Sequence, residues 1–289
     1  MKFAICNETF ENGSQQEGLQ RAKELGYTGV EVAPFTLGTY AHEITKDARL
    51  QYRSLVQDLG LEIIGLHWLL AKTQGFHLTT SDHAIRAKTA DYFKHLIELC
   101  ADLGGNIMVL GSPAQRNFPE SMTHDQASEN AARTLEQIVP ALEASHIRLA
   151  IEPLGPQEGN FLNHASQART LIDRIVSPNV RLHLDVKAMS SEGIPIETII
   201  RDNADLVIHF HANDPNKLGP GMGDVDQAPI FQALEDIRYN GWVSVEVFDY
   251  SPGVETILQK SMETMQRCLK LAKSNASVGN GTPTKSSHA

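Results

Sequence analysis

Short apolar runs of strand length alternate with longer segments of helical periodicity along most of this chain. The apolar runs predict strands at residues 2–6, 29–33, 61–68, 106–111, 148–153, 180–186, 206–211 and 242–248. The segments between and after them predict helices at 14–25, 46–59, 82–103, 124–145, 164–176, 195–203, 227–238 and 253–272. Because apolar strands that alternate with helices usually pair in parallel, the pattern indicates an α/β fold.

Eight strand–helix units favour closure of the sheet into a single (β/α)8 TIM barrel, a fold that typically needs about 250 residues. The 289 residues of the chain suit one such domain. An open, doubly wound sheet is the alternative, but no glycine-rich dinucleotide-binding turn follows the first strand. We expect the barrel to span residues 1–273. Residues 274–289 are rich in Ser, Gly, Asn and Thr and lack an apolar period, which predicts a disordered C-terminal tail.

Four side chains with metal-binding chemistry each close one of the last four apolar runs. They are Glu152, Asp185, His211 and Glu246. They lie about 30 residues apart, which is the length of one strand–helix unit. In a parallel barrel the strand ends converge on one face, where active sites form. One such residue alone is more commonly a solvated loop residue, but four in succession predict a divalent metal site.

Three carboxylates and one imidazole suit a hard divalent cation better than a structural zinc, which prefers cysteine-rich sites. We therefore expect one ion, with Mn²⁺ favoured over Mg²⁺, Co²⁺ and Zn²⁺. Such an ion acts as a Lewis acid on a carbonyl oxygen. The adjacent proton then becomes acidic enough for a nearby carboxylate to remove it. Such a site tolerates a neutral sugar whose hydroxyl and carbonyl oxygens fill open coordination positions.

The bulk composition narrows the range of partners. A formal net charge of −10 and the absence of an obvious basic face argue against nucleic-acid binding. No apolar run approaches the roughly 20 residues of a membrane span, and the first residues do not resemble a signal peptide. Cys6, Cys100 and Cys268 are far apart and form no metal or redox motif. We therefore expect a cytoplasmic protein with reduced thiols and a small-molecule substrate.

Five segments carry a resemblance to a known family, namely IEPLG, HLDVKAM, HFHANDPN, GPGMGDVD and VSVEVF. They resemble the xylose-isomerase-like TIM barrel superfamily, in its sugar phosphate isomerase/epimerase group. The ligand spacing is most similar to that of the ketose 3-epimerases of the tagatose and allulose type. The resemblance covers roughly residues 2–272 and is strongest in the last four strands.

The resemblance implies roles for the four strand-end residues. Glu152 and Glu246 would be both metal ligands and the acid/base pair, moving a proton on opposite faces of C3 through a cis-enediolate. Asp185 and His211 would be ligands only. A homo-oligomer, either a dimer or a tetramer, is also implied.

The candidate substrate contacts share these strand ends and the loops that follow them. They are Glu158, His67, Trp68, Arg116, Lys187, His183 and Lys217. The resemblance places Glu158 near the reactive end of the sugar, although an exposed loop charge is equally plausible. It also places Lys217 where the epimerases carry an arginine, so the charge is kept but the forked geometry is lost. A solvated lysine is an equal alternative there.

Position alone supports the other candidates. His67 and Trp68 end the third apolar run, where a rim imidazole and an aromatic wall for a sugar would lie, although core packing explains Trp68 about as well. His183 lies two residues before Asp185 and therefore on the same strand face. A histidine there is more commonly part of the core. Arg116 could bind an anionic group or form a surface ion pair.

Two positions depart from the epimerase pattern. Ala188 stands where the epimerases have a histidine three residues after the aspartate, and Pro113 stands where they keep an aromatic wall. Lys187 adds a charge nearby. With Arg116 and Lys217, it could favour a phosphorylated, acidic or otherwise modified sugar.

Three other functions stay open. An inosose dehydratase-like lyase would begin with the same proton removal and then lose a hydroxyl group. A non-catalytic metal- or sugar-binding barrel would keep the ligands without turnover. An AP endonuclease is disfavoured, because it needs several more histidines, including one where this chain has Ala188, and because the net charge is acidic.

Overall fold

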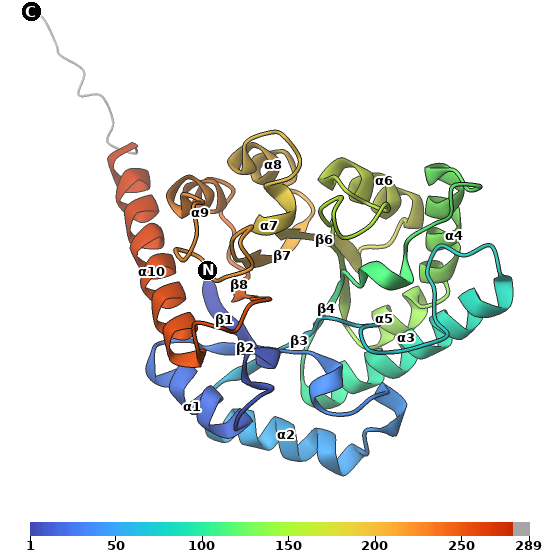
Figure 1. Cartoon of the computed structure of the whole chain (residues 1–289), viewed down its shortest axis with the longest axis horizontal. Coiled ribbons are helices and arrows are strands. Elements are labelled where there is room, and N and C mark those ends of the chain that lie inside the picture. Colours follow the sequence, from blue (N-terminus) through green and yellow to red (C-terminus); the bar gives the residue numbers. More distant parts are fainter. Residues whose placement is uncertain (280–289) are drawn as a thin grey trace, which may run out of the picture.

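The computed structural model describes residues 1–279 of the chain. Eight strands form a ring with the helices arranged around its outside (Figure 1). The strands pair in chain order, all in parallel, and β1 closes the ring by pairing with β8. The predicted single (β/α)8 barrel is therefore confirmed. Within these residues, no helix is both long and apolar enough to cross a membrane.

The strands coincide with the predicted apolar runs. They are β1 (Lys2–Cys6), β2 (Gly29–Val32), β3 (Glu62–Leu66), β4 (Ile107–Leu110), β5 (Arg148–Ile151), β6 (Val180–Asp185), β7 (Val207–Ala212) and β8 (Trp242–Val245). Because β3 ends at Leu66 and β5 at Ile151, His67 and Glu152 are the first residues beyond their strands. The carboxyl ends of the strands thus carry the polar side chains that the sequence places there.

The helices surround this barrel. They are α1 (Gln15–Glu24), α2 (Lys46–Asp58), α3 (His83–Leu103), α4 (His124–Glu136), α5 (Val139–Ala144), α6 (Ala165–Ile175), α7 (Val186–Met189), α8 (Ile196–Asp202), α9 (Gln227–Asp236) and α10 (Val254–Gly279), with short 3-10 helices η1 (Asn7–Phe10), η2 (Pro34–Thr36), η3 (Ala41–Glu43) and η4 (Pro113–Gln115). Side-chain caps fix several starts, since Ser14, Thr45 and Thr123 each accept a hydrogen bond from a backbone N–H of the first turn.

Three helical details differ from the prediction. The helix expected at 124–145 is divided into α4 and α5, because Pro140 has no N–H to donate to the carbonyl of Glu136 and instead lies in the first turn of α5. The short helix α7 directly follows Asp185. Helix α10 continues past the expected end at residue 272 as far as Gly279. The rest of the expected tail, residues 280–289, lies outside the described residues.

The inside of the barrel changes from apolar to polar along its length. A small apolar cluster fills the amino end and comprises Ala4, Ile64, Ile107, Val109, Ala150 and Trp242. Trp242 packs so closely on Gly29 that a Cβ there would overlap its ring. Towards the carboxyl ends the buried interior side chains are polar, as with Glu31, His183 and His209. The apolar cluster therefore closes one end of the barrel, and the polar chemistry gathers at the other.

Candidate active site and metal centre

The four predicted metal ligands converge at the carboxyl end of the barrel. Ligand atoms of Glu152, Asp185, His211 and the neighbouring His183 all lie within 4.8 Å of one another. Glu246 Oε2 lies 3.1 Å from Nδ1 of His211. All of these side chains are buried. The structure thus assembles three carboxylates and one imidazole from four consecutive strands, together with a second imidazole.

Burial and mutual repulsion dominate the electrostatics of this cluster. Burial raises the pKa of Glu152 well above its usual value, and the nearby Glu246 and Asp185 carboxylates raise it further. Burial also raises the pKa of Asp185. For Glu246 burial acts in the same direction, but the His211 and His67 imidazoles outweigh it and lower the pKa. Buried carboxylates that face one another in this way are relieved by a cation, so the donor set fits a hard divalent ion.

The Asp185 side chain is fixed from two sides. Its Oδ1 accepts a hydrogen bond of 2.8 Å from the backbone N–H of Ala188, in the first turn of α7. Its Oδ2 accepts one of 2.6 Å from Nδ2 of Asn213. Ala188, which stands where the epimerases have a histidine, thus donates its main-chain N–H to the Asp185 carboxylate. Asn213 is absent from the predicted site, although the HAND segment that contains it directly follows His211.

A glutamate on β2 that the sequence analysis did not select holds two of the histidines. Glu31 is buried, and its Oε2 accepts hydrogen bonds from Nε2 of His209 at 2.7 Å and from Nε2 of His211 at 3.1 Å. Burial would raise the pKa of Glu31, but these two imidazoles outweigh it and hold the pKa well below its usual value. Because Nε2 of His211 is committed to Glu31, Nδ1 is the nitrogen left for a metal, and it faces Glu246.

His67 links Glu246 to the first strand. Its Nδ1 lies 3.1 Å from Glu246 Oε1, and its Nε2 lies 2.9 Å from Glu8 Oε2. With a carboxylate oxygen at each ring nitrogen, His67 is suited to the imidazolium form, which donates from both. His67 therefore orients Glu246 as well as lining the space above it.

His183 is a buried imidazole without a hydrogen bond to the described residues. Neither ring nitrogen has a partner, and Nε2 lies 3.8 Å from Glu152 Oε1. Burial, and then the neighbouring His211 and His209 rings, lower its pKa well below the usual value. A neutral imidazole has one nitrogen without a proton. Beside Glu152, that nitrogen can accept a hydrogen bond or bind a metal. The interpretation of His183 as a hydrogen-bonded core residue therefore does not fit its surroundings.

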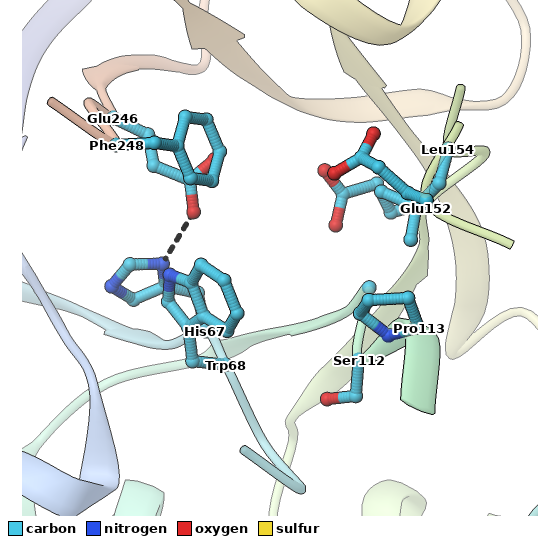
Figure 2. Close-up of a pocket in the computed structure, with 10 residues that line it drawn as sticks. His67, Trp68, Ser112, Pro113, Glu152, Leu154, Glu246 and Phe248 are labelled. Atoms are coloured by element: carbon cyan, nitrogen blue, oxygen red, sulfur yellow. Dashed lines mark hydrogen bonds and ion pairs between the residues drawn. The ribbon is translucent and has the colours of Figure 1, made fainter. Parts of the chain in front are cut away.

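A small pocket with a cavity volume of about 20 Å³ lies directly above these residues. Figure 2 shows Glu152 and Glu246 on opposite sides of it, with His67 beneath Glu246. Trp68, Glu158 and Phe248 also line it. Gly111 at the end of β4 makes room for Glu152, since a Cβ there would overlap Oε2 of that glutamate.

The remaining candidate substrate contacts are divided between the pocket and its surroundings. Glu158 lines the pocket and forms a 2.6 Å ion pair with the buried Lys187, whose Nζ also lies 4.6 Å from the centre of the Phe248 ring. Arg116 is buried outside the pocket lining, where Nη1 donates a 2.7 Å hydrogen bond to the main-chain carbonyl of Glu152. Lys217 is exposed and lies outside the pocket lining.

Comparison with known proteins agrees with this architecture. Residues 19–268 match the family described as the xylose isomerase-like TIM barrel. The chain belongs to this family. It is 26% identical over 245 residues to a probable ketose 3-epimerase of Synechocystis sp., covering 82% of this chain and 80% of that protein. It is 29% identical over 236 residues to a D-psicose 3-epimerase of Agrobacterium fabrum, covering 80% of this chain and 78% of that protein.

A solved structure shows the same fold over nearly the whole chain. The structure of an L-ribulose 3-epimerase superposes with a TM-score of 0.82 and covers 98% of this chain and 100% of that one. The sequence identity is 20%, so this likeness speaks for the fold alone.

Proposed function

We propose that this protein is a divalent-metal-dependent epimerase that inverts a carbon next to the carbonyl of a ketose, with C3 as the favoured position. The observation that carries the proposal is the placement of Glu152 and Glu246. Glu152 lies in one cluster with His183, Asp185 and His211, and Glu246 contacts His211 of that cluster. The two carboxylates lie on opposite sides of one pocket. Epimerisation needs this arrangement, because a proton must leave from one face of the sugar carbon and return to the other. The names of the relatives, which include ketose and D-psicose 3-epimerases, agree with it.

In this proposal Glu152, Asp185, His211 and Glu246 hold the metal. The bound ion supplies Lewis-acid polarisation of the substrate carbonyl, which makes the neighbouring C–H acidic. One of Glu152 and Glu246 removes the C3 proton, and the other delivers a proton to the opposite face. Asp185 keeps its position through the hydrogen bonds from Ala188 and Asn213. Trp68 and Phe248, which meet edge to face, line the pocket above the metal centre.

Solvent deuterium exchange tests the reaction class. Metal-loaded protein is incubated with ketoses, keto-acids and inososes in D₂O, and the C–H bonds beside each carbonyl are followed by NMR. We expect deuterium to enter at C3 of a ketose together with formation of the C3 epimer. Exchange with loss of water would instead identify an inosose dehydratase-like lyase. Binding without exchange would identify a non-catalytic barrel, and cleavage of abasic DNA alone would place the protein in a different class.

A further inference from the structure

A second, larger chamber adjoins the pocket above the metal centre. It has a volume of about 430 Å³ and shares Trp68, Ser112, Pro113 and Phe248 with the inner pocket. Two of these four shared residues, Ser112 and Pro113, have small side chains. The next residue, Ala114, lines the larger chamber only. The two cavities therefore lie side by side, with Trp68, Ser112, Pro113 and Phe248 lining both.

The walls of this outer chamber are largely aromatic. Phe35, Trp68, Phe248 and Tyr250 line it. Trp68 and Phe248 meet edge to face with their ring centres 5.9 Å apart. The Trp68 indole N–H is buried and has no hydrogen-bond partner among the described residues. Aromatic walls with a few polar groups are typical of sites for small molecules.

The charges of the outer chamber are already neutralised. The one lysine in its lining, Lys72, forms a 2.6 Å ion pair with Glu11 and lies 3.8 Å above the Phe35 ring. Glu8 is paired with His67 at 2.9 Å. Because no unpaired cation is present in the lining, a phosphate or carboxylate would find no counter-charge there. Lys187, which lies outside the lining of the inner pocket, is paired with Glu158, which is part of that lining.

On these grounds we propose that the outer chamber binds an uncharged glycosyl group, so that the preferred substrate is a glycosylated ketose rather than a free or phosphorylated one. This inference rests on the proposed epimerase function. The ketose unit occupies the inner pocket with its carbonyl at the metal centre. The attached sugar ring packs one of its C–H faces on the aromatic wall.

A substrate panel tests the proposal on the unmodified protein. The initial rates of deuterium exchange and epimer formation are compared for fructose, fructose 1- and 6-phosphate, and 4-O-, 5-O- and 6-O-glucosyl fructose. We expect kcat/KM for at least one glucosyl fructose to exceed that of fructose by about tenfold or more, which corresponds to about 1.4 kcal/mol. If fructose or a phosphate is the best substrate, the glycosyl site is excluded while the epimerase function stands. If no compound exchanges, both proposals fail.

A substitution that fills the chamber supplies an independent test. Ala114→Phe places a large side chain in the outer chamber at an exposed position of η4. We expect the ratio of kcat/KM for the glycosylated ketose to that for fructose to fall by about tenfold. The matched control is Ala144→Phe, at an exposed position at the end of α5, just before the amino end of β5, where the ratio should not change. An unchanged ratio in Ala114→Phe would overturn the proposal.

Discussion

The two halves of the barrel contribute differently to one site. The carboxyl ends of β5–β8 supply all four candidate metal ligands. The first four strands supply none of these four ligands. However, Glu31 on β2 bonds to His211, and His67 after β3 bonds to Glu246. The segment after β4 provides part of the pocket wall. The comparison indicates that the second half carries the chemistry, whereas the first half orients the ligands and shapes the space for the substrate.

The largest effect is expected where the comparison places the chemistry. Glu152→Gln or Glu246→Gln should lower epimerisation by about 10³-fold, because each removes one of the two groups that move the proton. The variants are followed by deuterium exchange, with bound metal measured in parallel to separate loss of the base from loss of the ion. Glu98→Gln, at an exposed position on α3, is the matched control. Full turnover by either variant would refute the two-base role.

Removal of the metal should have the next largest effect. Chelation should abolish exchange and lower the melting temperature, since Glu152, Asp185 and Glu246 then face one another without a cation. A ligand at 100 times its Kd stabilises the folded state by about 2.7 kcal/mol, which corresponds to a shift on the order of 5 °C. Differential scanning fluorimetry with Mn²⁺, Mg²⁺, Co²⁺ and Zn²⁺ measures the recovery, and we expect Mn²⁺ to restore activity best. Unchanged activity in protein shown to be metal-free would contradict the prediction.

The positioning role of the first half predicts an intermediate effect. Glu31→Gln should weaken metal binding by about 10-fold to 100-fold, as found for residues that orient metal-bound histidines, because His211 loses the carboxylate that fixes its ring. Metal affinity is measured by titration of the metal-free protein, independently of turnover. Glu62→Gln is the control, since Glu62 is exposed at the start of β3 and pairs with Lys2. If both variants bind metal equally well, Glu31 does not position His211.

The smallest effect concerns the wall of the pocket. Lys187→Met removes the buried partner of Glu158 while keeping a side chain of similar length. We expect KM to rise by about tenfold, equivalent to about 1.4 kcal/mol, with kcat and metal content nearly unchanged. Steady-state kinetics distinguish the cases, because a fall in kcat at constant KM would indicate that Lys187 takes part in proton transfer instead.

The sequence predicts most of the fold because each strand–helix unit repeats the same pattern. The break between α4 and α5 is an exception: one helix is predicted over 124–145, and Pro140 accounts for the break. The four ligands are predictable because strand ends in a parallel barrel must converge. Glu31 is different, since it stands between valines inside an apolar strand, and only the assembled barrel reveals that its interior is polar at that level.

The loops account for the rest of what the sequence does not predict. Lys217 adopts a positive φ of 73°, and its main-chain carbonyl accepts hydrogen bonds from the backbone N–H groups of Phe248 and Asp249, while its side chain is exposed. Arg116 follows η4 and turns behind Glu152 rather than into the pocket. In both cases the direction of the side chain depends on a loop conformation that is set by distant segments.

The fit of Gly111 against Glu152 has a consequence for mutational tolerance. Any side chain at position 111 would displace the Glu152 carboxylate, so the two positions should vary together, if at all, although they lie on different strands. Directed evolution of this scaffold towards new sugars should therefore hold Gly111 constant. It should diversify Pro113 and Ala114, which follow Gly111 by two and three residues. A deep mutational scan scored by epimer formation should find that position 111 tolerates no substitution, whereas positions 113 and 114 tolerate many.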